Sequence, residues 1–488
     1  MTFNFVSLTI LYIWFLLGLY TVKLQAGEKM SALGKYRSSF SFLAFFAGPI
    51  GLAVYFGTEN RKMLEKYFAF LKPKEPVRDV KHLNLVFLDN KGRDMFASHN
   101  ASSDVIEYVK KFIYDAITKG CSDVFIDPKD DAYMIRFRVD GLIRIYDTVL
   151  EDKALAVVSM IKVAAGMDIA EKRRPQDGSF SASCDGVNTS FRVASVGVFG
   201  GEKITIRVIA SESSQRTLAN IGLAPEQLKI IMSCLKMPSG MILMCGPTGS
   251  GKTSTLYSML SSIDYSIKNV ISIEDPIERV VPYISQMEVN AKADITFASL
   301  LRNALRQNPD VICVGEIRDE ETAEIAAHAA QTGHLIIATL HSNDNIGTII
   351  RLTDLGLQLR AISACLHLIV SQRLVRVLCP RCKRPARLTE EQKAFCAKHG
   401  IPPATILEAN GCPDCDSTGY VGRRAVFEVL VMDSGLRAIM ESPTATTSAI
   451  QEYVRVHQGN YTISSMTMRM VLNGETSWAE FERVTINI

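Results

Sequence analysis

The sequence predicts an α/β protein with a strand-and-helix core, a smaller α+β domain before it and a four-cysteine subdomain after it. The apolar run Met241–Cys245 leads into a glycine-rich turn and a helix-like stretch. Further apolar runs at 270–273, 311–314 and 334–339 lead into charged or histidine residues, where ligands bind at the carboxyl edge of open α/β sheets. Upstream of residue 214, short runs rich in β-branched residues predict further strands.

The turn after Cys245 matches the phosphate-loop pattern, two glycines five residues apart followed by Lys and Ser or Thr. The glycines let backbone N–H groups curl around a polyphosphate, the lysine supplies charge, and the hydroxyl is offered to Mg²⁺. Chance also produces this pattern, but its place between an apolar strand and a helix indicates a nucleotide site. The predicted ATP- and Mg²⁺-binding residues are Gly246, Pro247, Thr248, Gly249, Ser250, Gly251, Lys252 and Thr253.

Composition limits the classes of partner and compartment. The 488 residues exceed a single core, and a net charge of +3 with 22% charged residues gives no reason to expect a nucleic-acid partner. Most of the eleven cysteines lack a CxxC partner, and several lie in apolar runs, as expected for a reduced compartment.

Residues 1–58 contain two uncharged, apolar runs, Thr2–Val22 and Ser38–Thr58, which predict two hydrophobic membrane segments. A buried core helix is the alternative. A membrane hairpin would export the basic residues of 23–37, against the positive-inside rule, whereas a re-entrant second run avoids this; the topology stays open. Residues 59–101 are expected to be a neck with one short strand, at 82–88.

Residues 102–214 are expected to form the α+β domain. A helix over 105–118 should end at Gly120, and strands should alternate with a second helix over 154–166. The polar stretch 211–217 is expected to be the linker to the nucleotide domain.

Carboxylates and histidines follow the apolar runs of the core. Glu274 and Glu278 lie in the sequence EDPIE, where they can orient water or hold a metal, and Glu316 follows 311–314 as in a Walker B segment. His334 and His341 flank the last run, in positions suited to phosphate sensing. Solvated acids and structural histidines are the alternatives.

Two CxxC pairs predict a structural zinc site with four thiolate ligands. The gap between the pairs is longer than in common zinc ribbons, and a redox pair or four free thiols is the alternative. The predicted Zn²⁺ ligands are Cys379, Cys382, Cys412 and Cys415.

These motifs together resemble the type II/type IV secretion ATPases, the hexameric motors of type II secretion and type IV pilus assembly. The resemblance covers residues from about 102 to the C-terminus. It rests on EDPIE as the Asp box, LRQNPDVICVGEIRDEETA as the Walker B segment, TGHLIIATLHSND as the His box and SQRLVRVLCPRC as the helix that follows. It implies a PAS-like domain over 102–214, a RecA-like ATPase domain over 215–376, a zinc subdomain over 377–417 and a helical region over 418–488.

The resemblance also implies a mechanism. ATP would lie between two domains of one subunit, with Arg192 and Arg207 of the smaller domain reaching its phosphates; the alternative for these arginines is salt bridging along the strands. A homohexamer would drive pilin or pseudopilin assembly through an inner-membrane platform protein, at the bacterial inner membrane with the catalytic domains on the cytoplasmic face.

Competing functions remain. The four cysteines favour assembly over pilus retraction, the runner-up, and a conjugation-related pilus system is also open. A RecA-like nucleic-acid translocase would need a basic, aromatic stripe, which the sequence lacks, and a non-hydrolysing scaffold would not need the carboxylates. The family's usual N-terminal docking domain is replaced here by the two hydrophobic runs, so we expect the chain to anchor itself in membrane lipid.

Overall fold

The computed structural model describes residues 84–88, 93–96, 103–209, 217–290, 293–402 and 405–485. The two hydrophobic runs expected to enter the membrane lie outside these residues. Within the described ranges, no helix has the length and apolar character needed to span a membrane.

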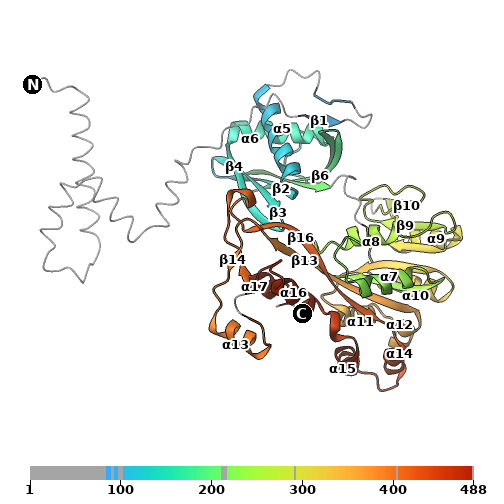
Figure 1. The fold of residues 1–488 in the computed structure, drawn as a ribbon. Coiled ribbons are helices and arrows are strands. Elements are labelled where there is room, and N and C mark those ends of the chain that lie inside the picture. The colour runs from blue at the N-terminus through green and yellow to red at the C-terminus, as the bar shows by residue number, and fades with distance from the viewer. Residues whose placement is uncertain are drawn as a thin grey trace, which may run out of the picture. The chain divides into compact units, whose positions relative to one another are not determined.

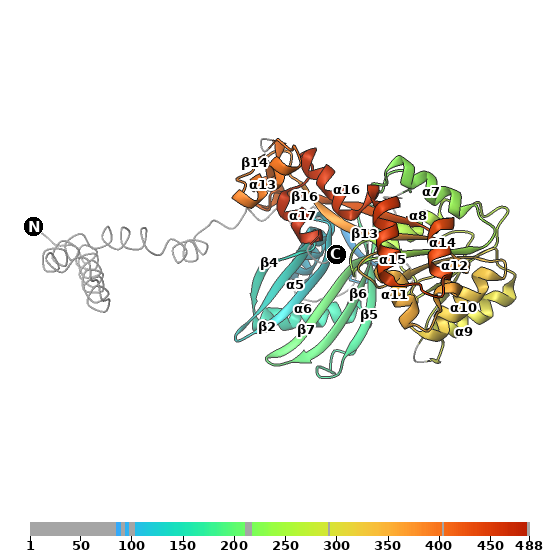
Figure 2. The ribbon, with the colours of Figure 1, turned by 90° about the horizontal axis from the view of Figure 1, so that it is seen from below.

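The first domain is an antiparallel sheet with two helices on one face (Figures 1 and 2). Its strand order is β1-β5-β6-β7-β2-β3-β4. Alternate strand residues and both helices share one apolar core, which explains why one sheet face is apolar and the other carries charged residues. The elements are β1 Leu85–Leu88, α5 Ser103–Thr118, β2 Cys121–Lys129, β3 Ala132–Val139, β4 Leu142–Leu150, α6 Glu151–Ala164, β5 Gln176–Cys184, β6 Val187–Val198 and β7 Gly201–Ile209.

This sheet reaches into the segment expected to be the neck. Strand β1 pairs antiparallel with β5, and its alternate residues Leu85 and Phe87 are buried in the domain core. The short strand expected in the neck is therefore the edge strand of this sheet.

The second domain contains a mostly parallel sheet of order β10-β9-β11-β12-β8-β13-β16. Successive residues of its central strands enter different cores, so both faces are apolar and both are covered by helices. The elements are α7 Pro225–Leu235, β8 Gly240–Cys245, α8 Lys252–Leu260, β9 Val270–Glu274, β10 Ser285–Glu288, α9 Phe297–Ala304, η3 Leu305–Gln307, β11 Val311–Val314, α10 Glu320–Gln331, β12 Leu335–Leu340, α11 Asn345–Asp354, α12 Leu359–Cys365, β13 Leu366–Leu378 and β16 Tyr420–Val431.

Two expectations for this domain are wrong. The stretch SQRLVRVL, expected to be a helix, is the second half of strand β13, which pairs in parallel with β8 and antiparallel with β16. The region 418–488, expected to be helical, begins with β16. Both strands are long and largely buried, and an apolar run of this kind does not distinguish a buried strand from a buried helix.

The remaining elements form the four-cysteine subdomain and the C-terminal helices. Trp478 and Val471 of the helices share a small core with Cys396 and Ile406 of the subdomain. The elements are β14 Arg384–Pro385, α13 Glu390–Lys398, β15 Leu407–Glu408, η5 Pro413–Cys415, α14 Ser434–Glu441, α15 Thr447–His457, η6 Gly459–Tyr461, α16 Ile463–Leu472 and α17 Trp478–Thr485.

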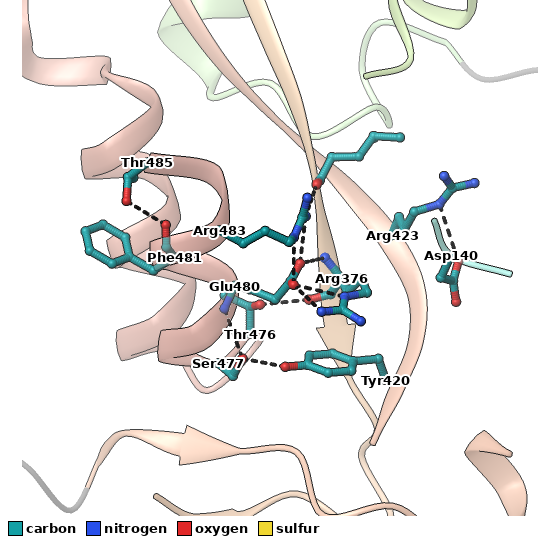
Figure 3. Close-up of polar contacts among 11 residues, drawn as sticks. Asp140, Arg376, Tyr420, Arg423, Thr476, Ser477, Glu480, Phe481, Arg483 and Thr485 are labelled. Atoms are coloured by element: carbon teal, nitrogen blue, oxygen red, sulfur yellow. Dashed lines mark hydrogen bonds and ion pairs between the residues drawn. The ribbon is translucent and has the colours of Figure 1, made fainter. Parts of the chain in front are cut away.

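A buried carboxylate fixes the last helix to the sheet. The fully buried Glu480 of α17 lies between Arg376 of β13 and Arg483 of its own helix (Figure 3). Arg376 donates through its backbone N–H at 2.9 Å and through its guanidinium at 2.6 Å, so both carboxylate oxygens are paired. The two arginines lower the pKa of Glu480 despite burial, which raises it.

Candidate functional site

The phosphate loop joins strand β8 to helix α8 and requires glycine at particular positions. Gly246 has φ 145°, and a Cβ there would lie 2.6 Å from the carbonyl oxygen of Gln372. Gly251, at φ 92°, precedes α8, and its Cβ would lie 2.8 Å from the Gln372 amide nitrogen. The loop therefore packs directly on strand β13, which leaves its backbone curved around the start of α8.

Lys252 and Ser250 give the loop a polar interior. The Lys252 ammonium donates to the carbonyl oxygens of Gly246 at 2.6 Å and Pro247 at 3.2 Å. Burial lowers the pKa of Lys252, while the nearby Glu316 raises it. The buried Ser250 hydroxyl has no hydrogen-bond partner among the residues that the structure describes.

A triphosphate fits this donor set. A buried lysine, an unpaired hydroxyl and a glycine backbone at the positive end of a helix are the groups that bind phosphate oxygens. The next residue, Thr253, is half-buried at the first turn of α8, where a hydroxyl can be offered to Mg²⁺.

Glu316 follows β11 and is paired on both carboxylate oxygens. His341 Nε2 lies 3.2 Å from Oε1, and Arg318 Nε donates to Oε2 at 2.7 Å. Arg318 also donates to Asp275 at 3.1 Å. The structure thus brings Glu316 and His341 together. The charge of Glu316 raises the pKa of Lys252, so Glu316 lies near the phosphate loop.

The two Asp-box glutamates differ in their surroundings. Glu274 is buried at the end of β9 and accepts hydrogen bonds from Tyr257, Ser272 and Gln286. Glu278 is exposed, but neighbouring atoms remove part of its hydration, which raises its pKa. The positive charges of Arg192 and Arg207 act in the opposite direction and lower it. Glu278 is therefore close enough to both arginines for their charges to act on it.

Arg192 and Arg207 are cross-strand neighbours on β6 and β7. Arg192 donates to the carbonyl oxygen of Ile277 in the Asp box at 3.0 Å, so it reaches the nucleotide domain. Arg207 is 68% exposed and lies 3.4 Å from Asp123 of its own sheet, the salt bridge considered as its alternative role.

His334 does not join this group. It precedes β12 at the opposite end of the strand from His341, and its Nδ1 lies 3.1 Å from the carbonyl oxygen of Ala329. A six-residue strand separates the two histidines, a distance of about 20 Å.

Two residues near the loop, Gln372 and Arg373, were missed by the sequence analysis. Gln372 accepts a hydrogen bond from Thr255 of α8 at 2.9 Å, and Arg373 donates to the carbonyl oxygen of Asn343 at 2.5 Å, in the segment that carries His341. Burial lowers the pKa of Arg373. Both are polar residues inside an apolar run, the signal that could have identified them.

The four predicted zinc ligands meet at one point. Their sulfur atoms all lie within 4.8 Å of one another, with Cys379–Cys412 at 3.9 Å, Cys382–Cys415 at 3.8 Å and Cys412–Cys415 at 3.6 Å. Four thiolates around a tetrahedral Zn²⁺ at 2.3 Å are about 3.8 Å apart, so the residues fit a structural zinc ion.

Polar contacts support this arrangement. The backbone N–H groups of Gly419 and Cys412 donate to the Cys415 sulfur at 3.1 and 3.2 Å, which is the usual support for a thiolate ligand. Arg381 of the first pair binds Asp414 of the second at 2.8 Å, so the two knuckles are also joined by an ion pair.

Known proteins have similar sequences. The family model for type II/IV secretion system proteins matches residues 98–483. The type II secretion system protein E of Pseudomonas aeruginosa is 41% identical over 388 residues, 78% of this chain and 75% of that protein. The type IV pilus assembly ATPase PilB of Myxococcus xanthus is 36% identical over 431 residues, 86% of this chain and 75% of that protein.

A solved structure has a similar fold. The pilus retraction motor PilT with bound ADP superposes with a TM-score of 0.52 at 25% identity, covering 77% of this chain and 96% of that one. The chain therefore belongs to the type II/IV secretion system protein family, whose secretion and pilus-assembly members are ATPases.

Proposed function

We propose that this chain hydrolyses ATP and, as a homohexamer, powers the extension of a type IV pilus or of a type II secretion pseudopilus. The observation that carries the proposal is the pairing of Glu316 with His341 beside the Lys252 phosphate loop. A carboxylate and a buried ammonium at the carboxyl edge of a parallel sheet are the groups that phosphoryl transfer uses, and the imidazole holds the carboxylate in place.

Each group has a proposed role. The loop 246–251 and Lys252 hold the phosphates, and Thr253 and Glu316 hold Mg²⁺, which supplies charge stabilisation when bound. His341 orients Glu316 and senses phosphate, whereas His334 lies too far along β12 to act on the same nucleotide within this chain.

The arginines are proposed to complete the site from the smaller domain. Arg192 already reaches the Asp box through Ile277, and Glu278 is its acidic neighbour. Guanidinium groups at this place neutralise charge that develops on the phosphates, and movement of the smaller domain would bring or remove them.

The partners are a membrane platform protein and pilin-like subunits. We place the chain at the bacterial inner membrane with its catalytic domains on the cytoplasmic face, held there by the hydrophobic runs of residues 1–58. Assembly is favoured over retraction because the assembly and secretion relatives are 36–41% identical, against 25% for the retraction motor, and because the four-cysteine cluster is typical of assembly members.

Phosphate release from the purified full-length chain tests the ATPase proposal. We expect Lys252→Ala and Glu316→Gln each to reduce turnover about 100-fold or more, because each removes a charge aimed at the phosphates or their metal. Lys229→Ala, an exposed lysine on α7, is the matched control and should keep wild-type turnover. Wild-type turnover in either site variant, with the thermal unfolding curve unchanged, would refute the assignment.

A further inference from the structure

A buried hydrogen-bond network surrounds Glu274. Its Oε1 accepts from the Ser272 hydroxyl at 2.7 Å and from the Gln286 amide at 2.8 Å, and its Oε2 accepts from the Tyr257 hydroxyl at 2.5 Å. Glu274 is only 6% exposed, so these three donors satisfy a carboxylate that has little access to water.

The same side chains hold the backbone of the Asp-box loop, residues 275–281. The Tyr257 oxygen accepts from the Arg279 N–H at 3.2 Å. The Gln286 amide donates to the Arg279 carbonyl at 2.9 Å and accepts from the Val281 N–H at 2.7 Å. The Arg279 guanidinium also lies over the Tyr257 ring, 5.0 Å from its centroid. The loop is therefore fixed at both Arg279 and Val281.

This loop carries groups of the nucleotide site. Asp275 binds Arg318, which also binds Glu316. Ile277 receives Arg192 from the smaller domain, and Glu278 faces both arginines. Tyr257 lies on the helix that begins at Lys252, about 7.5 Å further along its axis. The network thus connects the phosphate-loop helix to the loop that receives Arg192.

We propose that Tyr257, Glu274 and Gln286 form a positioning network that fixes the Asp-box loop relative to the phosphate loop, with Glu274 acting through this loop and not on water. The proposal deepens the proposed ATPase function and rests on it for its kinetic consequence. Removal of the Tyr257 hydroxyl leaves the phosphate loop intact but releases Arg279 and leaves Glu274 Oε2 without its donor.

The kinetic test uses Tyr257→Phe in the full-length chain. We expect kcat for ATP to fall about tenfold, because Glu278 and the Arg192 contact lose their fixed position, while the Kd of a fluorescent ATP analogue stays within about twofold of wild type. Arg192→Ala should then reduce kcat less in the Tyr257→Phe background than in the wild-type background, because both changes act on one contact.

Tyr265→Phe is the matched control. Its hydroxyl donates to the backbone carbonyl oxygen of Leu260 at 2.6 Å, and among the described residues it has no hydrogen bond to the Asp-box loop or to Glu274. We expect its kcat to stay within about twofold of wild type. Equal losses in the two tyrosine variants, or an unchanged kcat in Tyr257→Phe, would overturn the proposal.

Hydrogen exchange separates this proposal from the ATPase assignment. In Tyr257→Phe the amide of Arg279, and in Gln286→Met the amide of Val281, should exchange at least tenfold faster, with no change in Tyr265→Phe. This readout needs no turnover, so it tests the network even if the chain does not hydrolyse ATP. Wild-type exchange at both amides would overturn it, and Gln286→Met serves if Tyr257→Phe does not fold.

Discussion

At the residue scale, three basic side chains surround the Glu316 carboxylate. His341 and Arg318 bind its two oxygens, and Lys252 lies close enough for the carboxylate charge to raise the lysine pKa, which burial lowers. The ammonium and guanidinium both oppose protonation of His341, whereas Glu316 favours it. The protonation of His341 therefore depends on three charged neighbours.

The pKa of His341 lies below its ordinary value of 6.5, mainly because of burial and next because of Lys252. As the pH falls through 6.5, the unfolded chain takes up this proton before the folded chain, so His341 lowers the stability of the folded state on acidification and has no such effect well above 6.5. We expect turnover to be flat above that value and to fall on its acid side. His341→Gln should remove that acid limb in a pH series of ATP turnover; an identical acid limb in the variant would contradict the assignment.

Residues of the site were predictable where the signal is local. The phosphate loop and the cysteine pairs are short patterns with fixed spacing, and the structure brings each set together. Gln372, Arg373 and Tyr257 come near the loop only through pairing or packing of distant segments. His334 and His341 lie at the two ends of one strand, as the sequence predicted, but a six-residue strand is too long for both to reach one nucleotide.

At the element scale, strand β13 explains the largest error. Its residues 371–378 extend the strand past the phosphate loop and pair antiparallel with β16. The four-cysteine subdomain lies between these two strands in the sequence. The pairing partner of this half of β13 lies about fifty residues further along the chain. A local sequence pattern therefore does not show that the segment is a strand and not a helix.

The four-cysteine subdomain should depend on zinc. We expect about one zinc per chain by elemental analysis, and a strong chelator should loosen the subdomain because four thiolates then lose their common ligand. Trp478 contacts Phe395 of α13 with ring centroids 5.4 Å apart and reports this change. In a Trp14→Phe background, chelation should shift the fluorescence to longer wavelength. Cys396→Ala, a cysteine outside the cluster, should keep its zinc, and a zinc-free wild type would contradict the site.

The helix α17 should depend on Glu480. We expect Glu480→Gln to cost roughly 3–5 kcal/mol, because Arg376 and Arg483 lose the charge of a fully buried partner. The lowered pKa of Glu480 means that its contribution is present above its ordinary value of 4.5 and is lost as the pH falls through the folded-state value. Thermal unfolding checks the cost, with Glu452→Gln, from an exposed pair with Arg455, as a near-neutral control.

At the scale of the whole molecule, the two hydrophobic runs within residues 1–58 are expected to hold the chain at a membrane. We expect removal of residues 1–58 to release the chain from membrane pellets while the ATPase domain stays folded, because the described domains have their own cores. Fractionation of cells that express the full and the shortened chain measures this. Unchanged membrane association of the shortened chain would show that another segment or a partner holds it there.

The position of β16 has a consequence for synthesis. This strand completes the sheet around the phosphate loop, yet it follows the four-cysteine subdomain in the chain. A ribosome must therefore translate beyond Val431 before strand β13 receives its second neighbour. A nascent or prematurely terminated chain that ends at the cysteines would present a long, apolar, unpaired edge, which is a template for aggregation and a target for proteolysis.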